Sequence, residues 1–352
     1  MSSEPPARFK ATSSTTDGAQ RRIREAVSRE TSMTHDVINL PRVSEDTSPV
    51  TSDRPSLHVS RETFEDLPIA SEARRAVDVL NPRGDSLPRP VTPRIVCIAN
   101  QKGGVGKTTT AVNLGAALAL YGLKVLVVDL DPQGNASTGL NVAHHSGLPS
   151  SYTMLVADAP LESVIQPVEG VANLWCIPAT IDLAGAEVEL VSVTERERRL
   201  KTALQASHQG FDYIFIDCPP SLGLLTVNAL VAAREVLIPI QCEYYALEGL
   251  GQLLHNVELV AEHLNPELYV STILLTMYDG RTKLADQVAH EVREHFTEEV
   301  IDVVIPRSVR LSEAPGYGQS IITYDPGSRG ATSYVAAAKE IARRGAGMGV
   351  TT

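Results

Sequence analysis

The sequence is poor in aromatic residues and cysteines, and each shortage excludes a class of protein. Aromatic residues make up 5% of the 352 residues, with one tryptophan, whereas hydrophobic residues make up 43%. This balance indicates an aliphatic core of the kind found in α/β domains. The cysteines are far apart in the sequence and form no CxxC, which argues against a disulfide framework or a zinc site. The simpler interpretation is that the four cysteines are buried thiols in a reducing cytoplasm. They are Cys97, Cys176, Cys218 and Cys242.

The sequence also lacks a long apolar run and an excess of positive charge. The most apolar stretch, residues 118–130, is interrupted by Gly122, Lys124 and Asp129, so it is too short to span a bilayer. The N-terminus has no apolar segment of the signal-peptide type. The formal net charge of −11 argues against nucleic acid as a partner, although an acidic protein can still carry a small basic patch.

Residues 1–93 differ in composition from the rest of the chain. They contain 32 Ser, Thr or Pro residues and show poor apolar periodicity, so they are predicted to form a disordered extension. Residues 21–30 and 71–80 are candidate helices within it, either transient or able to fold on contact with a partner. Residues 81–94 are predicted to be a proline-rich linker.

From residue 94 to residue 352 the pattern becomes an alternation of apolar strands and helices. Near-continuous apolar strands separated by helices predict a three-layer α/β domain, with a mostly parallel sheet covered by helices on both faces. Strands are expected at 94–100, 124–131, 174–179, 213–220, 235–241, 271–279 and 300–306. Helices are expected at 108–122 and at 193–207.

Residues 95–110, IVCIANQKGGVGKTTT, have the order strand, glycine-rich turn and helix that a phosphate loop requires. The general pattern GxxxxGK[ST] fails at one position, which is Gln101. Glycines in the turn let backbone N–H groups converge on phosphate, and the following helix adds its N-terminal donors. Lys107 is expected to bind the β- and γ-phosphates of ATP, and the Thr108 hydroxyl to bind Mg²⁺. The predicted nucleotide-binding set is Gly103, Gly104, Val105, Gly106, Lys107, Thr108 and Thr109.

Carboxylates follow two of the predicted strands. Asp129 and Asp131 are two residues apart, so they point to the same side at the carboxyl end of a strand, where α/β sheets bind ligands. Asp217 ends the apolar stretch YIFID in a Walker B pattern, and its carboxylate is expected to help hold Mg²⁺.

The stretch KGGVGKTT at 102–109 resembles the deviant Walker A motif of the ParA/MinD class of P-loop ATPases. The resemblance implies that two ATP-bound subunits face each other and that Lys102 reaches the phosphates of the partner, while Lys107 binds nucleotide in its own subunit. It also implies that Lys102, Lys107 and Asp131 are catalytic, with Asp131 orienting the attacking water and Asp129 in a supporting role. Pro306 and Arg307 would lie beside the adenine.

Cys218 follows Asp217, and the same superfamily includes iron proteins that hold an iron–sulfur cluster. Cluster ligation requires cysteines that converge. The sequence suggests no matching pair, so an iron–sulfur cluster is not expected.

Residues 94–345 are similar to the chromosome-type ParA proteins, most clearly at 241–250, 274–282 and 310–318. The resemblance implies chromosome or plasmid segregation by an ATP-dependent homodimer. That dimer would be cytoplasmic and nucleoid-associated, bind double-stranded DNA non-specifically, and be stimulated by a ParB-type centromere-binding protein. The implied DNA-binding residues are Arg281 and Arg310, which the sequence alone would assign to ordinary ion-paired surface positions. Residues 1–93 are a candidate segment for binding a polar scaffold protein.

Three alternatives stand beside this interpretation. A membrane-associated ATPase of the MinD type would need a C-terminal amphipathic helix, and the glycine-rich end of this sequence is not expected to form one. A plasmid-type repressor would need a helix-turn-helix in residues 1–93, where no pair of apolar-periodic helices is evident. A nucleotide-gated adaptor without turnover is the third, and Asp131 argues against it.

Overall fold

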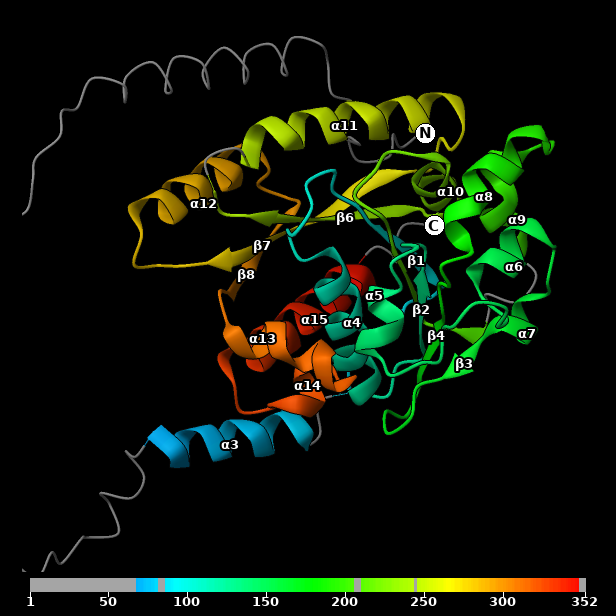
Figure 1. Cartoon of the computed structure of the whole chain (residues 1–352). Helices are drawn as coiled ribbons and strands as arrows, with labels where there is room; N and C mark the ends of the chain where they lie inside the picture. The colour runs from blue at the N-terminus through cyan, green and yellow to red at the C-terminus, as the bar shows by residue number, and fades with distance from the viewer. Residues whose placement is uncertain (1–67, 82–85, 206–209, 244–245, 348–352) are drawn as a thin grey trace, which may run out of the picture. The chain divides into compact units, whose positions relative to one another are not determined.

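The computed structural model describes residues 68–81, 86–205, 210–243 and 246–347 (Figure 1). Residues 1–71 and residues 72–352 are separate units. Of the first unit only residues 68–71 are described, and they begin helix α3 (Pro68–Leu80). All architecture given below belongs to the second unit.

The described residues form one eight-stranded sheet with the order β3-β4-β2-β5-β1-β6-β7-β8. Every neighbouring pair is parallel except the antiparallel edge pair β3–β4. The predicted mostly parallel sheet is therefore confirmed. The strands are β1 (Arg94–Ile98), β2 (Val125–Asp129), β3 (Gln166–Pro167), β4 (Leu174–Ile177), β5 (Tyr213–Asp217), β6 (Glu235–Gln241), β7 (Tyr269–Tyr278) and β8 (Val300–Pro306).

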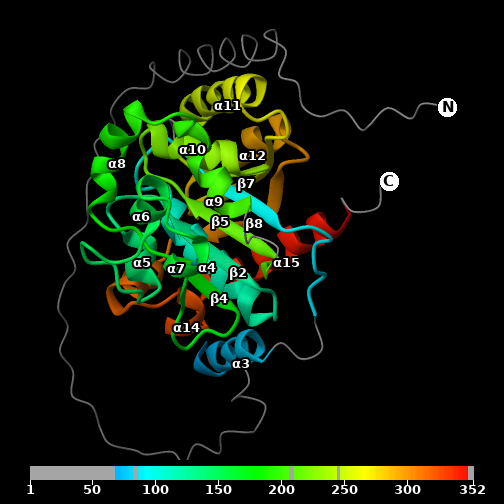
Figure 2. The same cartoon turned by 90° about the vertical axis from the view of Figure 1, so that its right-hand side faces the viewer.

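Helices cover both faces of the sheet, as Figures 1 and 2 show. Alternate residues of β1 serve the two apolar layers, with Cys97 in one cluster and Val96 and Ile98 in the other. The first layer is covered by α6 (Ser151–Val156), α7 (Leu161–Val164), α8 (Leu183–Glu189), α9 (Arg199–Gln205), α10 (Leu224–Ala232), α11 (Ala246–His263) and α12 (Lys283–His295). The second is covered by α4 (Lys107–Leu120), α5 (Asn135–Gly139), α13 (Val309–Glu313), α14 (Ile321–Tyr324) and α15 (Arg329–Gly347).

The helix expected at 193–207 is interrupted. A 3₁₀ turn at Arg196–Arg198 precedes α9, and Glu195 has a left-handed backbone conformation with φ 54°. A residue in that conformation cannot continue an α-helix, so the helix begins only at Arg199. The prediction was wrong in its start, while its last two residues lie outside the described part.

The described residues between 72 and 93 pack more than their composition predicts. The Arg75 Nε donates to the Gly327 carbonyl at 2.9 Å, and Val79 and Leu87 are buried within the second apolar layer. The expectation of disorder is therefore wrong for these positions, because a few apolar residues suffice to dock a short segment. The candidate helix at 21–30 lies outside the described residues, and the boundary at 93/94 stays a prediction.

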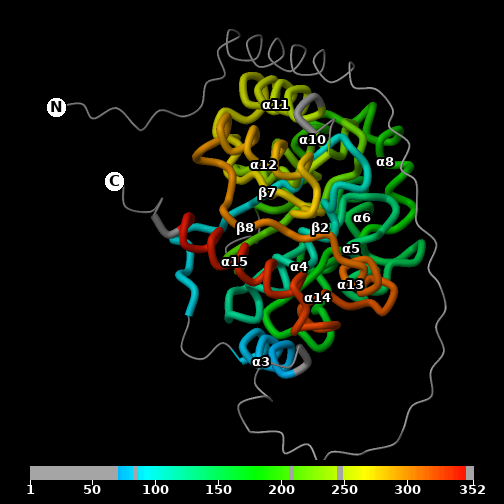
Figure 3. The backbone as a smooth tube through the Cα atoms, turned by 90° about the vertical axis from the view of Figure 1, so that its left-hand side faces the viewer, coloured from blue at the N-terminus to red at the C-terminus, as the bar shows by residue number. Residues whose placement is uncertain are grey.

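The C-terminal helix α15 continues to Gly347, further than the glycine-rich sequence suggested (Figure 3). Its apolar residues Ala337, Ala338, Ile341 and Ala342 are buried in the second layer, so this face is already covered by the domain. Within the described residues no helix is both long and apolar enough to cross a membrane.

A buried ion pair fixes the amino-terminal end of β1. Both guanidinium edge nitrogens of Arg94 donate to the carboxylate of Glu235 in β6, at 2.7 and 2.6 Å, and the side chains are 9% and 5% exposed. The third nitrogen, Nη1, donates to the Ile341 carbonyl of α15 at 2.8 Å. The pair thus joins the central strands to the C-terminal helix.

Replacing Glu235→Gln leaves the Arg94 charge buried without its counter-ion. We expect the free energy of unfolding to fall by about 3 kcal/mol, the usual cost of breaking one side of a buried pair. Urea unfolding of wild type and variant measures this. Replacing both residues by apolar ones, Arg94→Met with Glu235→Leu, should restore much of the loss. A single variant within about 0.5 kcal/mol of wild type would contradict the account.

Candidate nucleotide-binding site

The glycine-rich loop lies between the carboxyl end of β1 and the first turn of α4. Gly104 and Gly106 have φ values of 78° and 91°, a left-handed conformation that favours glycine. A Cβ atom added at Gly103 or Gly104 would meet no atom within 4 Å. The space beside these two glycines is therefore open, and the loop leads into the start of a long helix, where backbone N–H groups can bind an anion.

Hydrogen bonds from neighbouring strands hold this loop in place. The Thr276 hydroxyl of β7 donates to the Val105 carbonyl at 2.8 Å. The Asn100 amide donates to the Pro239 carbonyl of β6 at 2.8 Å, and its oxygen accepts the Lys102 N–H at 3.0 Å. The sequence did not predict a role for Asn100 or Thr276. A polar residue at a strand end does not indicate which distant residue it will hydrogen-bond.

The three aspartates meet at the carboxyl ends of adjacent strands. Asp129 of β2 is directly opposite Asp217 of β5, and Asp131 follows two residues after β2. All are buried, at 0%, 0% and 8% exposed for Asp129, Asp217 and Asp131. Lys107 is electrostatically coupled to Asp217 and Asp131 and is itself 7% exposed. The structure therefore brings Lys107, Asp131 and Asp217 together.

Asp217 is the least satisfied group of the cluster. Within the described part of the chain, neither of its carboxylate oxygens has a hydrogen-bond partner. Burial and then the nearby Asp129 carboxylate raise its pKa well above the usual value, while the Thr108 side chain and Lys107 oppose the shift. A buried carboxylate without a partner is costly, and a cation bound beside it removes that cost.

In contrast to Asp217, both carboxylate oxygens of Asp129 accept hydrogen bonds, and those to Oδ2 come from Ser137 of α5. Its Oδ2 accepts the Ser137 N–H at 2.9 Å and the Ser137 hydroxyl at 2.7 Å, and its Oδ1 accepts the Asp131 N–H at 3.1 Å. Burial raises the pKa of Asp129 to about 6. Because Asp129 accepts the Asp131 N–H, it positions the start of the loop that carries Asp131. Ser137 is a further positioning residue that the sequence did not indicate.

The residues present fit a magnesium–nucleotide. Lys107 donates to the Lys102 carbonyl at 3.3 Å, so its ammonium already lies across the mouth of the loop. Burial lowers the pKa of Lys107, whereas Asp217 opposes this shift. The unpartnered Asp217 carboxylate and the adjacent Thr108 hydroxyl supply oxygen ligands of the type that Mg²⁺ requires. The glycine loop supplies N–H donors of the type that phosphate requires.

Lys102 lies apart from this cluster. Its Nζ contacts the Glu243 carboxylate at 2.9 Å, and the two side chains are 38% and 48% exposed. The other Glu243 oxygen accepts a hydrogen bond from the Gln241 amide. The two lysines of the loop therefore have different environments, one buried beside Asp217 and one paired at the surface.

The remaining predicted residues lie on other elements. Pro306 ends β8, and the Arg307 N–H that follows donates to the Tyr278 carbonyl at 3.1 Å, beside the end of β7. Arg281 lies in the loop after β7 and Arg310 in α13, with side chains 88% and 59% exposed. Both arginines are ion-paired within their own chain. The structure does not bring them into the nucleotide site.

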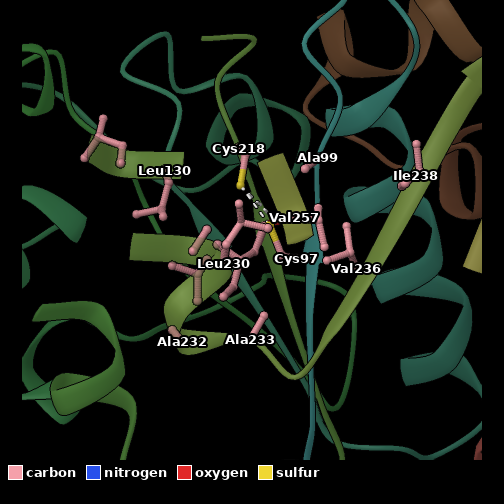
Figure 4. Close-up of a cluster of buried hydrophobic side chains, with 14 of the residues drawn as sticks. Cys97, Ala99, Leu130, Cys218, Leu230, Ala232, Ala233, Val236, Ile238 and Val257 are labelled. Atoms are coloured by element: carbon pink, nitrogen blue, oxygen red, sulfur yellow. Dashed lines mark hydrogen bonds between the residues drawn. The ribbon is translucent and has the colours of Figure 1, made fainter. Parts of the chain in front are cut away.

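Two of the cysteines converge although they are far apart in the sequence. The sulfur atoms of Cys97, in β1, and Cys218, directly after β5, are 3.4 Å apart in the first apolar layer (Figure 4). Both are free thiols. The hydrogen bond with Cys97 and then burial raise the pKa of Cys218 well above its usual value. The described residues contain no cluster of three or more His, Cys, Asp or Glu side chains suited to a metal ion.

The fold and the loop define a P-loop nucleotide-binding protein. Residues 93–270 match the AAA domain family. The chain is 58% identical over 252 residues to "Sporulation initiation inhibitor protein Soj" of Bacillus subtilis, covering 72% of this chain and 99% of that protein. It is 54% identical over 251 residues to "Chromosome partitioning protein ParA" of Myxococcus xanthus, covering 71% and 88%.

Solved structures agree with the fold. The structure of the Mycobacterium smegmatis protein "Cobyrinic Acid a,c-diamide synthase", with bound ADP and magnesium, is 38% identical with a TM-score of 0.62. The match covers 71% of this chain and 94% of that protein. The septum site-determining protein MinD of Pyrococcus horikoshii, complexed with Mg-ADP, is 26% identical at a TM-score of 0.58, covering 71% and 96%. This chain belongs to the ParA/Soj family of P-loop ATPases.

Replacing Thr276→Val removes the hydrogen bond to the Val105 carbonyl while keeping the side-chain shape. We expect nucleotide affinity to fall about five- to tenfold, because a loop with one anchor fewer must be ordered on binding. Titration with a fluorescent ATP analogue measures the dissociation constant. Thr272→Val, on the same strand but without a contact to the loop, is the matched control. Equal losses in the two variants would show that the anchor has no specific role.

Proposed function

We propose that this protein is a chromosome or plasmid segregation ATPase that works as an ATP-dependent sandwich dimer on DNA. The observation that carries the proposal is the separation of the two loop lysines. Lys107 is buried beside Asp217, whereas Lys102 is half-exposed and paired with Glu243. A cation on the phosphate loop that is half-exposed and paired with a surface carboxylate is available to a second subunit. Family membership and the names of its relatives support the same function.

Binding of ATP in the chain's own site would use the buried group of residues. The N–H groups of Gly103 to Thr109 would donate to the phosphates, and Lys107 would contact the β- and γ-phosphates. The Thr108 hydroxyl and, through water, the Asp217 carboxylate would hold Mg²⁺, which neutralises developing charge on the phosphate oxygens when bound. Mycobacterium and Pyrococcus relatives with bound ADP and magnesium support ATP and Mg²⁺ as the ligands. Pro306 and Arg307 would flank the adenine.

Hydrolysis would use residues from two subunits. Asp131 follows β2 and is held through its Oδ1, which accepts the Gln133 N–H at 3.0 Å. In this position its carboxylate can orient a water against the terminal phosphate. Lys102 of the partner subunit would add a second positive charge to the transferring phosphoryl group, where a preorganised cation lowers the barrier.

DNA binding would follow from dimer formation. Arg281 and Arg310 are exposed and can contact backbone phosphates, which suffices for binding without sequence preference. A single subunit carries a small patch against a net charge of −11, and a dimer doubles the patch. Hydrolysis, stimulated by a ParB-type centromere-binding protein, would separate the subunits. The separated subunits would then leave the nucleoid for the cytoplasm. A polar scaffold protein remains a proposed partner of residues 1–93.

Retardation of random duplex DNA tests the dimer and the DNA together. We expect wild type to bind DNA with ATP and Mg²⁺, to bind at least tenfold more weakly with ADP, and Lys102→Ala with ATP to behave like the ADP form. The physical reason is that affinity depends on the number of phosphate contacts per particle. Lys124→Ala, an exposed lysine at the far end of β2, controls for loss of one charge. Binding that ignores both nucleotide and Lys102 would refute the proposal.

Replacing Asp131→Ala separates an ATPase from an adaptor without turnover. We expect ATP hydrolysis to fall on the order of 100-fold while ATP still binds, because the water loses its orienting group. ATP-bound dimers should then accumulate on DNA. Phosphate release and the DNA-bound fraction are measured on the same sample. Unchanged hydrolysis would remove Asp131 from the reaction.

A further inference from the structure

Arg281 is held by a carboxylate of its own loop. Its Nε donates to Asp279 Oδ1 at 2.8 Å, and its Nη2 donates to Asp279 Oδ2 at 2.7 Å. This two-point arrangement uses the edge of the guanidinium that would also bind a phosphate in two-point fashion. The Asp279 side chain is 25% exposed, whereas the Arg281 side chain is 88% exposed.

The position of Asp279 is fixed by the turn that joins β7 to α12. Its Oδ1 accepts the backbone N–H of Arg281 at 3.1 Å, and its carbonyl accepts the Thr282 hydroxyl at 2.9 Å. Thr282 caps α12 by accepting the Ala285 N–H. The carboxylate is thus anchored to the backbone, while Arg281 is a long side chain that can leave it.

Arg281 lowers the pKa of Asp279 to about 2, and the nearby Arg307 contributes to the same shift. Asp279 therefore carries a full negative charge at neutral pH. That charge lies at the place where a DNA phosphate would have to approach Arg281, so it opposes the phosphate even when the arginine turns its other edge outward.

Arg310, the other exposed arginine assigned to DNA, shows a similar arrangement. Its Nη1 lies 3.2 Å from Glu313 and its Nε lies 3.5 Å from Asp325. Two arginines on separate elements thus each carry a neighbouring carboxylate. In the DNA-free subunit the carboxylates partly balance the charge of these arginines. This weakens DNA binding, which suits a surface that has to release DNA.

We propose that Asp279 is an internal competitor of DNA, which holds Arg281 in the free subunit and must exchange it for a DNA phosphate on binding. The proposal rests on the function proposed above, in which Arg281 contacts DNA. Exposed ion pairs contribute little net stability, so a phosphate can displace the carboxylate without unfolding the turn. Asp279 lowers DNA affinity and keeps it in the range where dimer separation releases the protein.

The test replaces Asp279→Asn in the full-length protein, because asparagine keeps the side-chain oxygen that accepts the Arg281 N–H and removes the charge. Affinity for a random duplex is measured with ATP and Mg²⁺ at about 0.1 M salt. We expect binding about five- to twentyfold tighter than wild type, since each dimer would lose two such competing ion pairs. Asp279→Ser, which also retains an acceptor for the turn, should tighten binding in the same direction.

Glu267→Gln is the matched control. It removes one exposed negative charge just before β7, at the opposite end of this ten-residue strand from Asp279. A strand of that length spans about 33 Å, well beyond the screening distance of about 10 Å at 0.1 M salt. We expect DNA affinity within about twofold of wild type. An equal gain from Glu267→Gln would show a non-specific effect of net charge and overturn the proposal.

The double variant Asp279→Asn with Arg281→Ala separates the inference from the function it rests on. Arg281→Ala alone should weaken DNA binding and reduce the slope of log affinity against log salt by about 2 per dimer. In that background the Asp279→Asn substitution should give no gain. If Arg281→Ala weakens binding but Asp279→Asn tightens nothing, or tightens it equally without Arg281, the competitor role is refuted. If Arg281→Ala binds DNA like wild type, the proposed use of Arg281 fails instead.

Discussion

The Asp217 carboxylate at the end of a fully buried strand sets the constraint around which this domain is arranged. It lies opposite Asp129, and among the described residues its oxygens have no hydrogen-bond partner. The nearby positive charge is Lys107, whose own burial disfavours its charged form. Negative charges so placed are costly in a low-dielectric interior, and a divalent cation with a nucleotide is the natural compensation. The glycine loop is held by hydrogen bonds from the strands. It presents its backbone N–H donors at the carboxyl end of the sheet, beside Asp217.

Four cations among the described residues form two groups that differ in their surroundings. Lys107 is enclosed by the site it serves, and Arg94 is enclosed by Glu235 at the opposite end of the sheet. Lys102 and Arg281 lie at the surface, each in an ion pair with a carboxylate of its own chain. Buried pairs are rigid and expensive to break, whereas exposed pairs exchange readily. The first group builds the fold and the nucleotide site, and we propose that the second group acts on partners outside the subunit.

The sequence predicted the parts of this arrangement that local patterns encode. Apolar strands alternating with helices predicted the parallel sheet, and the motif KGGVGKTT predicted a phosphate loop with Lys107 and Thr108 at the start of a helix. Contacts between distant segments were not predictable, because a threonine in β7 or a serine in α5 has no local signature of its partner. Thr276 and Ser137 were missed for that reason, and so was the approach of Cys97 to Cys218. Composition also failed at Val79 and Leu87, where two apolar residues pack despite a polar surrounding sequence.

A structure of the protein determined with Mg²⁺ and a non-hydrolysable ATP analogue tests the central claim most directly. Lys102 now lies 2.9 Å from Glu243 of its own chain. The account predicts two facing subunits in which Lys102 has left Glu243 for the phosphates bound by the partner, with Asp217 linked to the metal through water. A nucleotide-bound subunit in which Lys102 contacts its own nucleotide, or remains on Glu243 with no second subunit facing it, would contradict the account.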